Sequence, residues 1–157
     1  MTTQPIRLER TYDAPAATIW RLWTTSDGIA SWWSPDGFVT EVRELDLRPG
    51  GALVHAMTAA APEQIEFMNN AGLPLTNVGR KTFTEVDEPT RLAYVSHVDF
   101  VPGHEPYEQL TEVDLTPDGD RTHVVMTVAP MHDDEWTERM IAGRKNELEN
   151  LAAVLAR

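Results

Sequence analysis

The sequence predicts an α+β fold in which a curved antiparallel sheet wraps around one long C-terminal helix. The first observation is a series of segments with alternating apolar and polar residues, typical of half-buried strands and separated by Pro and Gly turn signals. The second is the segment 133–156, where apolar residues recur three and four positions apart, as on one face of a helix. Because a curved sheet around a single helix tends to leave a space between the two, we also expect a pocket there.

The composition is that of one globular domain, which we expect to span 1–157. Of the 157 residues, 41% are hydrophobic and 24% are charged, and a core of this size can bury about 68–70% of the unfolded surface. Thirteen basic and 25 acidic side chains give a net charge of −12. Such a charge repels phosphate backbones and anionic lipid surfaces, so we expect neither nucleic acid nor a membrane as a partner.

The sequence contains no cysteine. This excludes disulfides, thiolate nucleophiles and zinc–thiolate sites, and it is compatible with a reducing compartment. Residues 1–10 lack the apolar run of a signal peptide, and no segment reaches the roughly 18 apolar residues of a membrane span. We therefore expect a cytoplasmic protein.

The first strand and the first helix are predicted near the N-terminus. Residues 6–11 alternate between apolar and polar side chains, which predicts a strand. Asp13 then offers an N-cap, and Pro15 suits the first turn of a helix whose apolar face carries Trp23.

A second short helix is expected to follow, capped by Ser26 or Asp27 and ended by Pro35. It would carry the adjacent Trp32 and Trp33. Because neighbouring residues on a helix point about 100° apart, we expect one tryptophan to fill the core and the other to line a cavity mouth.

The central part of the chain predicts six more strands. Val42 is poorly placed in the alternation of the first of them, and Pro49-Gly50-Gly51 is a strong turn signal after it. Asp118-Gly119 supplies the positive φ that a tight hairpin turn needs before the last. The predicted strands are 39–47, 53–58, 79–86, 91–100, 108–116 and 121–129.

Two segments complete the expected order of elements. Residues 59–77 predict a long loop with one helical turn around 63–68, because Pro62, Gly72 and Pro74 interrupt any regular pattern. Residues 133–156 predict the final helix, about 36 Å long at 1.5 Å per residue. The acidic residues at its start complement the positive end of the helix dipole.

Alternation along the predicted strands places polar side chains on the face that should point inward. A polar group that points inward needs a hydrogen-bond partner or a water molecule, and a tightly packed core rarely holds a whole set of them. They therefore favour a hydrated or ligand-holding cavity. These side chains are His55, Tyr94, Ser96, Gln109 and Thr111.

The sequence carries no recognisable catalytic or metal-binding motif. The five histidines show no metal-ligand spacing such as H-E-x-x-H. The glycine-rich turn Pro49-Gly50-Gly51 lacks the Lys and Ser/Thr of a phosphate loop, and there is no G-x-S-x-G elbow. We therefore assign no catalytic residue, metal site or cofactor.

Several motifs, spread over nearly the full length, resemble the activator of Hsp90 ATPase homologue-like family. This family belongs to the SRPBCC superfamily, which includes START, birch-pollen-allergen-like (Bet v 1-like) and polyketide-cyclase proteins. The chain departs from the family pattern in its long 59–77 segment and at Met140–Arg144, where a further aromatic residue is common. The matching motifs are Tyr12-Asp13-Ala14-Pro15, Trp32-Trp33-Ser34-Pro35-Asp36-Gly37-Phe38, Leu47-Arg48-Pro49-Gly50-Gly51 and Leu151-Ala152-Ala153-Val154-Leu155.

The resemblance implies a helix-grip fold with two short helices after the first strand. Family members usually enclose an apolar cavity. Some superfamily members bind lipids, sterols or plant hormones, some cyclise polyketides, and the namesake stimulates a chaperone ATPase. The fold by itself does not choose among these functions.

The function that we expect is non-catalytic binding or transport of an apolar or amphipathic small molecule. The ligand would lie between the sheet and the last helix, where Trp and Met side chains suit an adaptable apolar ligand. The residues expected to line this cavity are Trp33, His55, Tyr94, Ser96, Thr111, Met126, Trp136 and Met140.

Two other functions remain open from the sequence. One is a chaperone-ATPase-activator-like interaction module, whose acidic surface would steer it to a basic protein partner. The other is a small cyclase or dehydratase in which His55 or Tyr94 transfers a proton. A homodimer is compatible with the sequence, although no apolar stripe is left over outside the expected core.

Overall fold

The computed structural model describes residues 3–157, and it confirms the predicted α+β class and helix-grip arrangement. Each predicted strand agrees with an observed one to within three residues at either end. The strands are β1 (Ile6–Tyr12), β2 (Phe38–Leu45), β3 (Ala52–Ala59), β4 (Thr76–Asp87), β5 (Arg91–Val98), β6 (Tyr107–Asp118) and β7 (Arg121–Val128).

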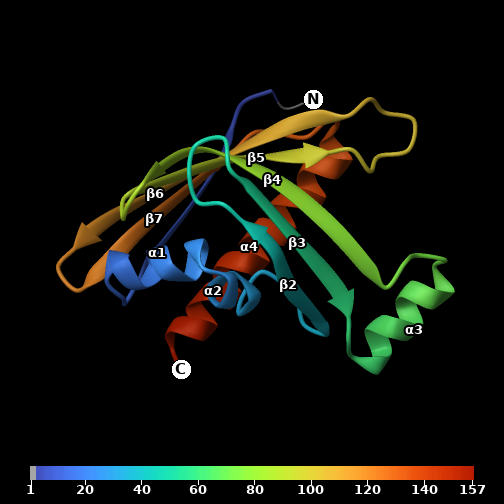
Figure 1. Cartoon of the computed structure of the whole chain (residues 1–157), viewed down its shortest axis with the longest axis horizontal. Helices are drawn as coiled ribbons and strands as arrows, with labels where there is room; N and C mark the ends of the chain where they lie inside the picture. The colour runs from blue at the N-terminus through green and yellow to red at the C-terminus, as the bar shows by residue number, and fades with distance from the viewer. Residues whose placement is uncertain (1–2) are drawn as a thin grey trace.

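The strands form one seven-stranded sheet in which all neighbours are antiparallel, in the order β1-β7-β6-β5-β4-β3-β2. The helices are α1 (Ala16–Thr24), α2 (Ser26–Ala30), α3 (Pro62–Asn70) and α4 (Asp134–Leu155). Figure 1 shows α4 crossing one face of the sheet, with α1 and α2 beside each other near the C-terminal end of α4. Within residues 3–157, no helix combines the length and the apolar content that a membrane crossing requires.

The caps of α1 and α2 differ from the prediction. Asp13 does not cap α1, because the helix begins at Ala16 and the cap position falls on Pro15, which makes no side-chain cap bond. The cap of α2 is Thr25 instead of Ser26 or Asp27. Its backbone is extended, and its hydroxyl accepts a hydrogen bond from the amide of Gly28 at 3.1 Å. The extended conformation at Thr25 separates the two helices.

The tryptophan pair lies outside α2, which corrects the prediction that this helix carries both side chains. The helix ends at Ala30, and residues 31–34 form a turn and a bend. Trp32 is fully buried, whereas Trp33 is half-buried. The expected division of the pair between core and cavity edge therefore arises from a turn and not from helical geometry.

The segment 59–77 contains the nine-residue helix α3 (Pro62–Asn70) in its middle. The predicted helical turn around 63–68 is confirmed and extended by this helix, whereas the prediction of a long loop over the whole segment is wrong. Pro62 occupies the first turn of α3, a position where its missing amide proton costs nothing. The helix ends in a Schellman motif: Gly72 has φ +70°, its amide donates to Asn69 O, and the amide of Leu73 donates to Met68 O at 2.9 Å. Pro62 and Gly72, which interrupt the sequence pattern, are thus the start and stop signals of α3.

A β-bulge in β2 explains the poor alternation of the predicted strand. The pairing with β3 shifts register between Val42 and Glu44. The extra residue, Arg43, changes the phase of alternation, so that Val42 and Leu45 both pack against the core.

The core fills the space between the sheet, the two short helices and the C-terminal half of α4. Tyr12 of β1 is buried in it and donates a hydrogen bond to Leu148 O of α4 at 2.8 Å, and burial raises the pKa of this phenol. The largest fully buried side chains are Trp23, Trp32, Tyr94, Phe83, Ile19, Ile29, Leu53, Leu92, Met126 and Leu151.

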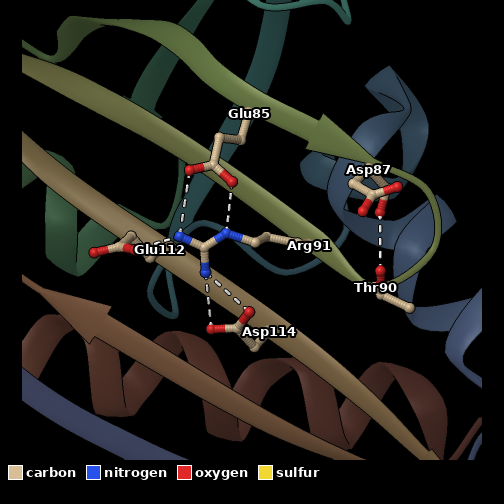
Figure 2. A network of polar contacts seen from close by, with 6 residues as sticks. All are labelled: Glu85, Asp87, Thr90, Arg91, Glu112 and Asp114. Atoms are coloured by element: carbon tan, nitrogen blue, oxygen red, sulfur yellow. Dashed lines mark hydrogen bonds and ion pairs between the residues drawn. The ribbon is translucent and has the colours of Figure 1, made fainter.

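The opposite face of the sheet carries a charged network centred on Arg91 of β5. Figure 2 shows its guanidinium reaching three carboxylates on the neighbouring strands. Nε donates to Glu85 Oε2 at 2.6 Å, Nη1 donates to Asp114 Oδ1 at 2.9 Å, and Nη2 donates to Glu112. Hydrogen bonding to Arg91 is the main cause that lowers the pKa of Glu85.

We expect Arg91→Leu to lower the melting temperature at neutral pH and to have little effect in acid. Because Arg91 lowers the Glu85 pKa below its ordinary 4.5, its stabilisation is present above that pH and is lost as the pH falls through the lowered value. In the variant the carboxylates repel one another only when ionised. Thermal unfolding of both proteins over a pH series from neutral into the acid range measures this; a loss that stays equal across the series would contradict it.

Candidate functional site

Two adjoining pockets lie between the sheet and α4. The larger has a volume of about 460 Å³ and includes Trp33, Met57 and Glu147 in its lining. The smaller, of about 260 Å³, includes Ser96, Gln109, Met140 and Arg144. Both are lined by His55, Gly79, Lys81 and Phe100. Because these residues are shared, the two pockets form one site, which we call the sheet–helix pocket.

Lys81 of β4 lines both parts of the sheet–helix pocket. Its Nζ donates a hydrogen bond to Ser96 Oγ on β5 at 2.9 Å. The same atom lies 5.5 Å from the ring centroids of both Trp33 and Tyr94, within cation–π distance. Burial, followed by repulsion from Arg144, lowers the Lys81 pKa to about 7.

Arg144 enters the pocket from α4 and is buried. Its Nη2 donates to Thr111 Oγ1 at 3.1 Å, and its Nη1 lies 3.5 Å from the Tyr94 hydroxyl. The nearest carboxylate oxygen, Glu147 Oε2, is 4.0 Å from Nη1, which is beyond hydrogen-bond distance. Burial raises the Glu147 pKa, although the attraction of Arg144 and Lys81 opposes this.

His55 of β3 forms one wall of the pocket. Its ring packs edge-on against Trp33 with 5.3 Å between centroids, and a Cβ at Gly79 would lie 2.7 Å from ring atoms. The missing side chain at Gly79 therefore leaves room for the imidazole. Burial, followed by repulsion from Lys81 and Arg144, lowers the His55 pKa to about 4, so the ring is neutral near pH 7.

Two residues of the lining each carry a buried ring nitrogen without a protein partner. His55 Nε2 and the indole Nε1 of Trp33 make no hydrogen bond to any group in residues 3–157. Buried polar atoms usually have a partner. The hydrogen-bonding capacity of both atoms is thus unused among residues 3–157.

The structure brings together four of the eight predicted site residues. Trp33, His55, Ser96 and Met140 line the sheet–helix pocket. Whether they contact a ligand stays a prediction.

Two more of the eight lie directly behind the pocket. Tyr94 and Thr111 are fully buried, stand opposite each other across β5 and β6, and hold the Arg144 guanidinium. Both point toward α4, in agreement with the predicted strand register. Their contribution to the site is to position Arg144.

The last two predicted residues line neither part of the pocket. Met126 is fully buried in the core and lies between β1 and β6, opposite Leu8 and Val113. Its predicted place at the cavity wall fails because this end of the sheet is covered by well-packed side chains. Trp136 packs on Phe100 and His132, with centroid distances of 6.0 and 5.4 Å.

The charged residues of the pocket were missed from the sequence, although each left a signal. Lys81 lies in phase with Phe83, whose side chain is buried. Arg144 occurs between Met140 and Leu148 on the apolar stripe of the last helix, where a charge is unexpected. Lys81 and Arg144 could therefore have been identified from the sequence, because each places a charge where the repeating pattern predicts an apolar residue.

The geometry of the described residues does not form a metal site. Among residues 3–157, no group of three or more His, Asp or Glu side chains is arranged to hold a metal ion. The lining of the pocket offers an amine, a guanidinium, a carboxyl group and an imidazole set among aromatic rings.

Comparison with solved structures places the fold among bacterial proteins of similar size. A protein from Chromobacterium violaceum superposes with a TM-score of 0.74 at 25% identity over 98% of each chain. One from Mycobacterium smegmatis gives 0.73 at 20% identity over 98% of this chain and 91% of the other. An AHSA1-like protein from Aeromonas hydrophila gives 0.69 at 22% identity over 94% and 90%. No curated protein matches the chain.

A match to a family model assigns the chain to a protein family, which the similarity of fold alone does not do. The family described as "Activator of Hsp90 ATPase homolog 1-like protein" matches residues 13–156, which is nearly the whole chain. Its fold supports a ligand-binding or carrier-type module in general. The motifs, the fold and this match lead to one conclusion: the chain belongs to the activator of Hsp90 ATPase homolog 1-like family.

Proposed function

We propose that this protein binds and carries a small apolar or amphipathic molecule in the sheet–helix pocket. The observation that carries the proposal is the lining itself. Aromatic and thioether side chains, Trp33, Phe100 and Met57, surround a few converging polar groups. This is the usual composition of a small-molecule site, and the volumes lie in or near the usual range of about 300–1,000 Å³.

The protonation states of His55 and Tyr94, the two candidates for proton transfer, favour binding over catalysis. A His55 ring with a pKa of about 4 is a weak base near pH 7. Burial raises the Tyr94 pKa, so this hydroxyl keeps its proton. Neither group is poised to exchange a proton at neutral pH.

A small enzyme is the second candidate, and one observation favours it. The Lys81 amine, with a pKa of about 7, can exchange a proton at neutral pH. Incubating a bound compound with the protein and analysing it by mass spectrometry separates the two functions. A carrier returns the compound unchanged, whereas an enzyme converts it.

A thermal-shift screen tests the carrier proposal. The panel would contain fatty acids, sterols, flavonoids and polyketide-like aromatics. A ligand at a hundredfold its Kd should add about 2.7 kcal/mol to the free energy of unfolding, which is about 5–10 °C for a domain of this size. A complete absence of stabilisation would overturn the proposal and favour the protein-interaction module.

A pocket-filling variant shows whether a stabilising compound occupies this site. We expect Met57→Trp, in the wall of the larger pocket, to abolish the shift because the indole takes up the ligand's space. Val39→Trp is the matched control, since Val39 is 55% exposed on neighbouring β2 and lines neither part of the pocket. Equal shifts in both variants would place the ligand elsewhere.

A further inference from the structure

The charge of the sheet–helix pocket is opposite to that of the protein. Acidic residues outnumber basic ones by 25 to 13 over the whole chain. The described residues of the pocket lining reverse this balance: Arg80, Lys81 and Arg144 stand against Glu147 alone. An acidic protein thus presents a locally cationic pocket.

Two of these cations approach the same place from opposite walls. Lys81 reaches it from the sheet and Arg144 from α4, and both approach Tyr94 behind the pocket, with Lys81 Nζ 5.5 Å from its ring and Arg144 Nη1 3.5 Å from its hydroxyl. Each cation repels the other, which contributes to the lowered Lys81 pKa. An anion between them would replace this repulsion by attraction to both.

Neither cation has a hydrogen-bonded carboxylate partner among residues 3–157. Lys81 donates to a hydroxyl, and Arg144 donates to two. Glu147 stays 4.0 Å from Arg144. Buried charges are ordinarily paired and hydrogen-bonded. Both side chains therefore have donors left for a ligand.

We propose that the sheet–helix pocket recognises a carboxylate, held between Lys81 and Arg144, with the apolar body of the molecule against Trp33, Met57 and Phe100. This inference rests on the proposed carrier function and specifies its ligand class. Of the charged lining residues, Arg80 is exposed, so the inner groups that a ligand meets are Lys81, Arg144 and Glu147. When these three are ionised, they sum to one positive charge, which a monoanion neutralises. A dianionic phosphate monoester would exceed that charge.

Three probes of matched shape test this proposal: 5-phenylpentanoate, 5-phenylpentan-1-ol and 5-phenylpentyl phosphate. Their affinities would be measured by isothermal titration calorimetry at neutral pH. We expect the carboxylate to bind at least about tenfold more tightly than the alcohol, because charge-assisted hydrogen bonds are stronger than neutral ones. The phosphate should bind no more tightly than the carboxylate.

Lys81→Met removes one cation and keeps a long apolar stem between the rings. It should reduce the affinity for the carboxylate about tenfold and leave that for the alcohol unchanged. Lys145→Met is the matched control, because Lys145 carries the same charge beside Arg144 in sequence but is exposed and outside the pocket lining. Arg144→Lys provides a second test, in which the charge is kept but the guanidinium donors are lost.

The outcomes separate this inference from the carrier function. Equal affinities for carboxylate and alcohol would overturn the carboxylate site and leave the carrier function standing. Tighter binding of the phosphate would overturn the preference for a monoanion. Failure of both the probes and the whole thermal-shift panel would overturn the carrier function and this inference with it.

Discussion

Replacing Trp32 by alanine is expected to lower the free energy of unfolding by about 3–5 kcal/mol. The Trp32 side chain is 1% exposed, packs edge-on against Trp23 with 4.7 Å between ring centroids, and donates from Nε1 to Leu22 O at 2.8 Å. Its loss would leave a cavity between α1 and the turn after α2 and one carbonyl without its partner. Thermal unfolding should show a decrease of roughly 6–20 °C.

The neighbouring tryptophan is the natural control for this variant. Trp33 is half-buried, lines the sheet–helix pocket and contacts His55 and Lys81. Trp33→Ala should therefore destabilise the protein clearly less than Trp32→Ala and should weaken ligand binding more. If Trp33→Ala were as destabilising and left binding unchanged, Trp33 would be a core residue and its place in the site would be wrong.

Lys81→Met is expected to make the ligand-free protein more stable. Lys81 is largely enclosed, and its pKa falls from 10.5 to about 7 because burial and Arg144 disfavour the charged amine. Replacing a buried charge by an apolar side chain of similar volume is often stabilising by about 1–4 kcal/mol. We expect a gain in this range in acid, reduced by the lost hydrogen bond to Ser96.

The gain from Lys81→Met should fade as the pH rises. The folded-state pKa lies below the unfolded one, so the charged amine destabilises the wild type most below pH of about 7. Above that value the folded protein releases the proton while the unfolded chain keeps it, and the wild type recovers stability up to the unfolded pKa of about 10.5. Urea unfolding of both proteins at about pH 6 and about pH 9 measures the difference.

A control and a contrary outcome complete this experiment. Lys145→Met, at an exposed position, should change stability by less than about 0.5 kcal/mol at both pH values. If Lys81→Met were instead less stable than the wild type at about pH 6, the charge of the Lys81 amine would already be compensated by other groups in the ligand-free protein. Together with the binding experiment, the predicted gain would show that the pocket keeps a destabilising cation for recognition.

The predicted secondary structure was most accurate where the signal is local. Alternation located all the strands, and apolar spacing located α4, because both periods arise from the geometry of neighbouring residues. The errors occurred at boundaries and caps. Asp13 and Ser26 are suitable cap residues, but the cap positions fall on Pro15 and Thr25. Pro62 predicts an interruption, whereas in the structure it begins α3.

The candidate site was only partly predictable for a different reason. The inward direction of His55, Tyr94, Ser96 and Thr111 follows from strand alternation, which needs no knowledge of the partner elements. Which of them reach open space depends on how closely α4 packs along the sheet. Met126 shows this: it faces inward as predicted, but the core fills the space in front of it.

The sequence by itself determined the order of elements, the family and the polar character of the inner face, since all three are properties of residues close together in the chain. Only the tertiary structure decided that Lys81 of β4 and Arg144 of α4 face the same pocket and that Glu147 lies 4.0 Å from Arg144, without a hydrogen bond to it. The proximity of these charged side chains depends on how α4 packs across the sheet. Residues distant in the chain are brought together there, and no local pattern records it.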